Sequence, residues 1–329
     1  MRHHRTTALV ALAAISAMSF TTASAAIADT GSGSDQADDI AAVVTEAAPF
    51  MNGGIELETS PTEATATLDG GGEAILAMDP ARGVRITSAD DTDSMSFSLP
   101  GASGLDDAAV AGDGSLNYVG DATTPSINLM TGAESIRVSV VIDNAAQADR
   151  FDYDFGPDAT VEIQDDGSAI AYVVESTTDP ATGGAAATEK IIANIDAPWA
   201  KDANGVEIPT YYEASGSQLT QFVDHQDGDY AYPIVADPTL DRPNVFQYRL
   251  RFNRAETATI ASGGAGIIAS VGCGVMAPVC VVAGGSVWWN ASVAQNSNPK
   301  RCVQVTATQP YIYPGVLWWV DTYSGGPCR

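Results

Sequence analysis

Val161-Glu-Ile-Gln-Asp-Asp-Gly-Ser-Ala-Ile-Ala-Tyr-Val-Val174 is the stretch that decides the fold of this 329-residue chain. Apolar and polar residues alternate on both sides of Asp165-Asp166-Gly167, and Asp-Gly between alternating runs is a strong β-hairpin signal. Short half-buried strands between turns, without long helical patterns, predict a mainly β fold, an antiparallel sandwich over residues 55–241 that is one large unit or two small ones. The same period of two recurs in Met95–Leu99, Ile136–Ile142 and Phe151–Phe155.

A different pattern precedes this region, in residues 26–54. A Gly/Ser/Asp linker comes first, and then Ile40, Val43, Val44 and Ala47 fall at helical spacing. Pro49 ends the pattern, because proline has no backbone N–H to continue a helix. We expect a linker and one short amphipathic helix.

The last segment, residues 242–329, has another composition. It holds all four cysteines and four of the five tryptophans, and no residue from Thr257 to Pro299 is charged. Its glycines weaken a helix by about 1 kcal/mol each relative to alanine, so a helix there needs close packing. We expect a disulfide-stapled, Gly-rich α-helical hairpin followed by a short β-hairpin. The predicted helices are 254–272 and 279–294, and the predicted strands are 303–307 and 316–320.

The start of the first C-terminal helix has its own signal. Asn253 is followed three residues later by Glu256, which is the spacing of a capping box. Pro278 separates the two apolar halves, so it marks the break between the two helices.

Charge divides the chain at the same place. Residues 26–241 carry 39 acidic and 6 basic side chains, whereas residues 242–329 carry 2 acidic and 7 basic ones. An acidic region of this size repels nucleic acid and anionic membrane surfaces, which argues against a nucleic-acid partner.

Residues 1–25 resemble a secretory signal peptide. Arg2 and Arg5 precede the uncharged run Ala8–Phe20, and small residues follow in Ala-x-Ala patterns. We expect cleavage before Ala26 or Asp29 and a secreted, extracellular protein, either free or associated with the cell surface.

Export allows disulfides, and an even number of cysteines favours them. Four cysteines allow three pairings, and we favour Cys273–Cys280 with Cys302–Cys328, because Pro278 lets the seven-residue separation close. These bonds are structural rather than redox-active, since the chain has no Cys-x-x-Cys.

Trp318 and Trp319 are the candidate binding residues. They are adjacent in a predicted strand, so they point to opposite faces. One belongs to the core, and the other either stacks on a sugar or covers the helical hairpin.

The uncharged run 257–299 has three interpretations: a buried hairpin, a resident membrane span, or a segment that inserts into another cell's membrane. It is long enough for a span, but a single span would place Cys302 and Cys328 in a reducing cytosol. The buried hairpin is favoured, and membrane contact through 257–299 stays open.

Chemistry-bearing motifs are absent from the sequence: there is no Gly-x-Ser-x-Gly elbow, His-Glu-x-x-His, Walker loop or dinucleotide fingerprint. After cleavage, His225 is the only histidine. Asp152 and Asp154 alternate as in calcium loops, but also as on a strand with one solvated face. We predict no catalytic residue, no metal site and no cofactor.

One part of the chain resembles a known group. Ile195–Tyr212, Leu219–His225 and Tyr232-Pro-Ile-Val-Ala-Asp-Pro238 resemble an uncharacterised family of proteins exported by high-GC Gram-positive bacteria. That family has a β-rich domain ending in a Tyr-Pro-Val-Val-Ala-Asp-Pro-like motif, followed by variable C-terminal modules. The resemblance covers roughly residues 35–238 and implies export, a β-fold and modularity, but no activity.

These features favour an exported, non-enzymatic protein that contacts a cell-envelope component or a protein partner. A membrane-active antagonistic factor, whose acidic domain neutralises a cationic tail, is the first alternative. A carbohydrate-active enzyme is the second, and carboxylates clustered in a groove would favour it.

Overall fold

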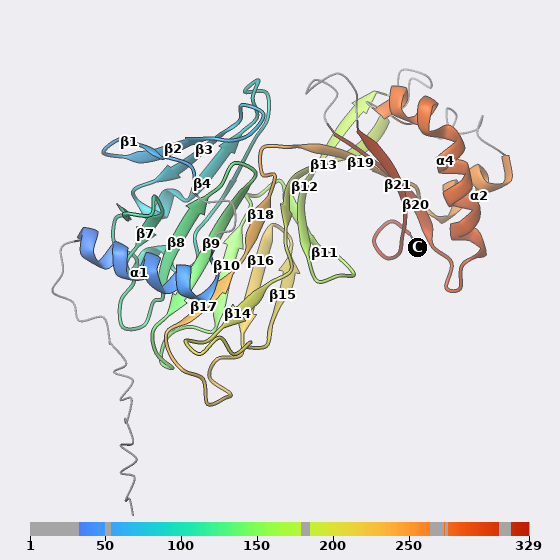
Figure 1. Cartoon of the computed structure of the whole chain (residues 1–329). Coiled ribbons are helices and arrows are strands. Elements are labelled where there is room, and N and C mark those ends of the chain that lie inside the picture. The colour runs from blue at the N-terminus through green and yellow to red at the C-terminus, as the bar shows by residue number, and fades with distance from the viewer. Residues whose placement is uncertain are drawn as a thin grey trace, which may run out of the picture.

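A computed structural model describes residues 33–49, 54–178, 185–263, 273, 276–308 and 317–328, with the side chains of residues 177, 178, 185, 186 and 277 left aside. The chain is mainly β, with antiparallel sheets and a C-terminal helical and β-hairpin part, as predicted. Figure 1 shows a large β-rich body and a smaller body that holds the last helix and strands. The predicted signal peptide lies outside the described residues.

Helices and 3-10 turns are few in the described part of the chain. They are α1 (Gly33–Ala47), η1 (Pro80–Arg82), η2 (Ala102–Gly104), α2 (Arg254–Gly263) and α4 (Ala277–Asn296).

Within the described residues, the strands form three sheets. The five-stranded sheet runs β1 (Glu58–Thr59), β2 (Glu63–Thr67), β3 (Glu73–Ala77), β4 (Val84–Thr87) and β5 (Ser94–Phe97). The three-stranded sheet runs β10 (Arg150–Asp154), β16 (Gln218–Val223) and β15 (Thr210–Ser215). The large sheet contains β6 (Ala109–Val110), β7 (Leu116–Tyr118), β8 (Ser126–Thr131), β9 (Ser135–Ile142), β11 (Ala159–Ile163), β12 (Ala169–Thr178), β13 (Ala185–Ile195), β14 (Trp199–Lys201), β17 (Ile234–Asp237), β18 (Thr239–Asp241), β19 (Gln247–Arg251), β20 (Cys302–Thr308) and β21 (Trp318–Tyr323).

The main core lies between the sheets of the larger body. Leu76 and Ile86 from the five-stranded sheet are fully buried with Leu116 and Leu129 from the large one. The hydroxyl of Tyr118 on β7 donates a hydrogen bond to the carbonyl of Ala77 on β3, at 2.6 Å. The burial of these apolar side chains supplies the main driving force for folding of the sandwich.

The predicted hairpin and leading helix are both present. β11 pairs with β12 in the register Ile163↔Ala169, and Gly167 takes the positive φ of 86° that the turn requires. Helix α1 buries Ile40 and Val44 against the β6–β9 face and β17, across the front of the larger body in Figure 1.

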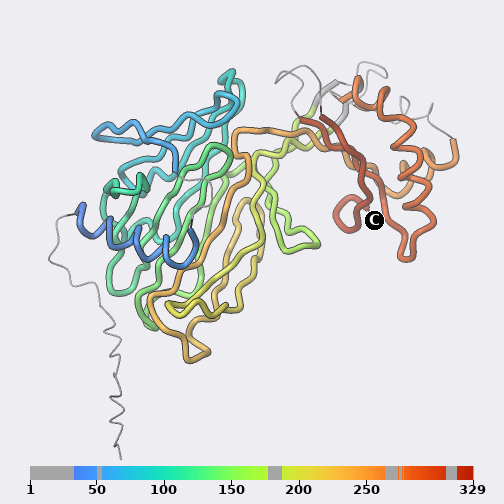
Figure 2. Tube along the Cα trace, viewed as in Figure 1, coloured from blue at the N-terminus to red at the C-terminus, as the bar shows by residue number. Residues whose placement is uncertain are grey.

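Strand β13 connects the two bodies. It pairs with β12 along its length, with β18 at Ile195 and with β19 at Glu189–Ile191. The sheet therefore continues past residue 241, where the composition changes, through β19 into β20 and β21. The tube in Figure 2 shows β12, β13 and β19 reaching together into the smaller body.

The smaller body follows the predicted order with shifted ends. The capping box is present: the Asn253 backbone N–H donates to the Glu256 carboxylate at 2.7 Å, and the Glu256 N–H donates to the Asn253 side chain at 3.0 Å. Helix α4 begins at Ala277, so Pro278 lies in its first turn, where proline costs no hydrogen bond. Most of the predicted helix beyond Gly263, and the start of the last predicted strand, lie outside the described residues.

The motif Tyr232-Pro-Ile-Val-Ala-Asp-Pro238 contains β17, an interior strand of the large sheet. β17 pairs with β9 on one side and β14 on the other, and its four residues are buried. Asp237 lies 3.8 Å from the Nε of Arg137 on β9 and accepts hydrogen bonds from Thr239. Burial nevertheless raises the pKa of Asp237 to about 7, against the lowering effects of Thr239 and Arg137. The long separation from Arg137 explains why attraction does not offset desolvation.

This pKa predicts a pH dependence of stability. In the unfolded chain the pKa of Asp237 is about 3.9. Between that pH and about 7, the folded chain holds a proton on Asp237 that the unfolded chain has released. Asp237 therefore favours folding at low pH, and its contribution is lost as pH rises from about 4 to about 7. We expect the free energy of unfolding of the wild type, relative to Asp237→Asn, to fall over this window in denaturation series. Parallel curves for the two proteins would show that Asp237 stays ionised beside Arg137.

Candidate functional site: the C-terminal contact face and the Trp319 groove

The four cysteines form two disulfides, Cys273–Cys280 and Cys302–Cys328, with Cα–Cα distances of 6.5 and 5.6 Å. This is the pairing that the spacing favours. The second bond holds Cys328 against the start of β20, and Tyr323 packs on it. The Tyr323 hydroxyl donates to the carbonyl of Phe252 at 3.1 Å, so the last residues are fixed to the smaller body.

Two arginines of the basic segment are buried in ion pairs with the acidic region. Arg249 Nε lies 2.6 Å from Glu189 Oε2, and Arg251 Nη1 lies 2.7 Å from Glu162 Oε2. Arg251 Nε also donates to Glu189 Oε1 at 2.8 Å. The arginine side chains are only 3% and 5% exposed. We call Glu162, Glu189, Arg249 and Arg251 the arginine–glutamate cluster.

The cluster is complemented by aromatic rings. The guanidinium carbons of Arg249 and Arg251 lie 5.1 and 5.5 Å from the Tyr172 ring centroid, within cation–π range. Burial alone would lower the pKa of Arg251, but Glu189 and Glu162 raise it above its usual value. Glu162 and Glu189 thus neutralise the charge of the two arginines inside the protein.

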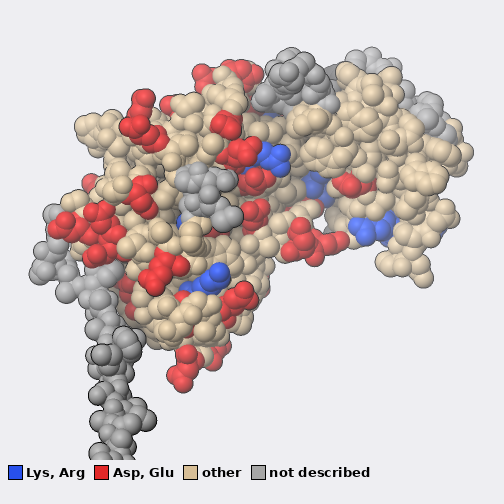
Figure 3. All heavy atoms as spheres, viewed as in Figure 1, with Lys and Arg blue, Asp and Glu red and all other residues tan. Residues whose placement is uncertain are grey.

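Helix α4 leaves an apolar face in solvent. Val281, Val282, Trp289 and Val293 are 76%, 72%, 64% and 48% exposed. The opposite side of the helix buries Ala283, Val287 and other small residues against β20 and β21. We call the four exposed residues the contact face. Figure 3 shows the smaller body as mostly uncharged, whereas acidic side chains are scattered over the visible face of the larger body.

The adjacent tryptophans of β21 point to opposite faces of the sheet. Trp318 packs into the core beneath α4. Trp319 is 40% exposed on the other face, where the cross-strand partners run Trp319↔Thr306↔Arg249↔Glu189. Trp319 therefore lies on the same sheet face as the arginine–glutamate cluster.

Trp319 borders a groove of about 340 Å³, which we call the Trp319 groove. The groove is lined by Asn194 of β13, by Asp196, which directly follows β13, and by Asp241 of β18. Desolvation, then Asp241 and Asp166, raise the pKa of Asp196, although its side chain stays exposed at the rim. An aromatic ring beside amide and carboxylate groups is an arrangement suited to a polar, ring-containing ligand.

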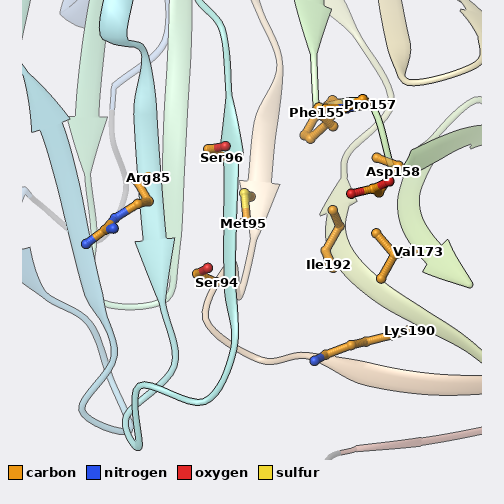
Figure 4. Close-up of a pocket in the computed structure, with 12 residues that line it drawn as sticks. Arg85, Ser94, Met95, Ser96, Phe155, Pro157, Asp158, Val173, Lys190 and Ile192 are labelled. Carbon is orange, nitrogen blue, oxygen red and sulfur yellow. The ribbon is translucent and has the colours of Figure 1, made fainter. Parts of the chain in front are cut away.

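A further pocket, of about 280 Å³, lies between the five-stranded sheet and the large sheet. Figure 4 shows Arg85, Ser94 and Met95 on one side and Asp158, Val173 and Lys190 on the other. The Lys190 side chain extends along the lower end of this pocket toward the strand that carries Ser94.

His225 is a structural residue. It is 1% exposed, and its Nε2 lies 3.1 Å from the carbonyl of Ala148, which can only accept a hydrogen bond. Nδ1 lies 2.9 Å from the Tyr232 hydroxyl. Both ring nitrogens are thus engaged, and the imidazole is not presented to solvent.

The alternating aspartates of β10 have local partners. Asp152 accepts a hydrogen bond from Thr220 at 2.6 Å and pairs with Arg150, and Asp154 caps the turn at Gly156. Within the described ranges, no group of three or more His, Cys, Asp or Glu side chains is arranged to hold a metal ion. None of the helices in the described part of the chain is long and apolar enough to cross a membrane.

Sequence reasoning found the tryptophan pair but missed what lies around it. Asp196 and Asp241 are two of many acidic residues, and only the pairing of β13 with β18 brings them together. The exposed face of α4 had a partial signal, since Val281, Trp289 and Val293 recur at helical spacing in an uncharged run.

No family model matches the chain, and no curated protein matches it either. Among solved structures, the chain has a likeness to a family 92 glycosyl hydrolase, ccman5. The alignment covers 49% of this chain and 22% of the hydrolase, at 14% identity and a TM-score of 0.19. A likeness at this level carries no argument about fold or activity.

Proposed function

We propose that the protein is an exported, non-enzymatic contact protein, which its C-terminal module attaches to a protein of the cell envelope. The contact face of α4 is the observation that carries the proposal. Four neighbouring apolar side chains in solvent are costly for a soluble protein, and such patches usually mark interaction sites.

Charge favours a protein partner over a lipid surface. The chain has a net charge of −26, which disfavours approach to anionic lipid. The positive charge that the basic segment presents is also reduced, because Arg249 and Arg251 are neutralised within the arginine–glutamate cluster. This argues against a cationic membrane-active tail and for an apolar protein surface as the partner.

The test is retention on the producing cell. We expect the triple variant Val281→Ser, Val282→Ser, Trp289→Ser to shift the protein from the washed cell surface to the medium by about tenfold, which corresponds to about 1.4 kcal/mol of lost contact free energy. The measurement is quantitative blotting of both fractions. Val206→Ser with Tyr211→Ser, at exposed apolar sites of the larger body, is the matched control. An unchanged distribution in the triple variant would exclude the contact face as the attachment site.

The Trp319 groove supports a second candidate, a carbohydrate-active protein. Two carboxylates, Asp196 and Asp241, lie in one groove beside an exposed tryptophan, and such pairs act in glycoside hydrolysis. The retention experiment separates the candidates when Trp319→Ala is added to it. If Trp319→Ala loses retention and the triple variant keeps it, the groove binds an envelope glycan and α4 plays no part.

A further inference from the structure

Lys190 of β13 is largely buried and lies among carboxylates and aromatic rings. It is one of only six basic residues between 26 and 241, and its side chain is 12% exposed. Its Nζ contacts Oδ1 of Asp93, which is itself buried at the end of the turn between β4 and β5. The contact joins the five-stranded sheet to the large sheet.

A second carboxylate, that of Glu175, also lies close to the Lys190 amine. Glu175 Oε1 lies 3.3 Å from Lys190 Nζ. Val173 on β12 is the cross-strand partner of Lys190, so Glu175, two residues further on, projects from the same face. Unlike Asp93, Glu175 keeps about a third of its side chain in solvent, with 36% exposed.

Aromatic rings lie beside the Lys190 amine, and local hydrogen bonds position Asp93. Lys190 Nζ lies 5.8 Å from the centroid of the Phe246 ring and 5.9 Å from that of Tyr248, and Phe246 is fully buried. Ser88 Oγ accepts from the Asp93 backbone N–H at 3.1 Å, and the Thr92 hydroxyl, which is 2.8 Å from Asp90 Oδ1, lies 3.3 Å from Asp93 Oδ2. Asp93 Oδ1 is thus the oxygen directed at the amine.

We propose that Lys190 and Asp93 condense into an intramolecular amide bond that links the two sheets, with Glu175 as the acid–base residue. Neutral Lys190 Nζ attacks Cγ of protonated Asp93 and forms the new C–N bond. Glu175 takes a proton from the nitrogen and delivers it to the departing hydroxyl, so that one C–O bond breaks and one water leaves. The amine and the acid become an amide plus water, and no oxidant or other reactant is needed.

The environment favours this product. Burying a lysine and an aspartate as ions costs desolvation free energy, whereas the amide carries no charge. Burial lowers the pKa of Lys190, which favours the nucleophilic amine, although Asp90 acts in the opposite direction. Fixed groups in contact react with effective molarities far above those in solution, and the exposed edge of Glu175 gives the water an exit.

The test is mass spectrometry of the full mature protein after reduction of its disulfides. We expect the wild type to be lighter than its sequence by one water, and a tryptic digest to contain the peptides of Asp93 and Lys190 joined, with no cleavage after Lys190. Lys190→Arg is the matched control, because arginine keeps the ion pair but its guanidinium is a poor nucleophile. This variant and Glu175→Gln should both show their full, unlinked masses.

Three results would overturn the proposal. An unlinked wild type, cleaved by trypsin after Lys190, would show that the site is an ordinary buried ion pair. A water loss confined to the Asp93 peptide would indicate dehydration of the aspartate alone. A complete link in Glu175→Gln would remove Glu175 from its acid–base role.

Discussion

Replacing Glu189 by glutamine should lower the free energy of unfolding by about 3–5 kcal/mol, the usual cost of removing one partner from a buried ion pair. Both Arg249 and Arg251 contact Glu189, which is the more buried of the two carboxylates that they share, and both guanidinium groups are buried. Without it, two positive charges would share Glu162, whose side chain is 33% exposed and which gives weaker compensation.

Tryptophan fluorescence during urea denaturation would measure this effect, because four of the five tryptophans lie in residues 242–329. Asp241→Asn is the matched control. It removes the Arg242–Asp241 pair, whose side chains are 62% and 43% exposed, and should cost at most about 1 kcal/mol. Similar losses in both variants would mean that the cluster is no more important than a surface pair.

Removing the Cys302–Cys328 disulfide, by a double alanine substitution, should be the second large effect. Its sequence separation is 26 residues, and closing a loop of that size stabilises the folded state by about 3.5 kcal/mol in the chain-entropy account. The corresponding figure for Cys273–Cys280, with a separation of 7, is about 2.4 kcal/mol. Loss of Cys302–Cys328 also removes the sulfur atoms against which the Tyr323 ring packs.

Hydrogen exchange with residue resolution is the measurement. We expect faster exchange in α2, α4, β20 and β21, while β2–β5 and β7–β9, which contain no cysteine, keep their protection. The Cys273→Ala, Cys280→Ala protein serves as the control and should change less. Unchanged protection of β20 and β21 in the first variant would show that the bond contributes nothing to the smaller body.

Local signals predicted the local structure well. The hairpin at Asp165-Asp166-Gly167 and the capping box at Asn253 each depend on a few neighbouring residues, and both are present. The helix over Ile40–Ala47 was also predictable, because one face of it must be apolar to cover the sheet.

Long-range pairing was not predictable from composition. Arg249 and Arg251 read as a surplus of positive charge in residues 242–329, yet their partners, Glu162 and Glu189, lie 60 to 89 residues earlier. The same holds for Lys190 and Asp93, which meet only because a turn of one sheet faces a strand of the other. The composition shows how many acidic and basic residues there are, but which of them pair depends on how the strands are aligned in the sheets.

The shared strand β13 determines how the molecule carries mechanical load. If the contact face is held by a partner, tension entering α4 passes through β20 to β19, and from there into β13 through the Glu189–Ile191 pairing. The Cys302–Cys328 bond lets a pull on the last residues bypass β21 and enter β20 directly. The ladder between β13 and β19 on this route has only three residue pairs, and the ion pairs of the arginine–glutamate cluster connect the same two strands through their side chains.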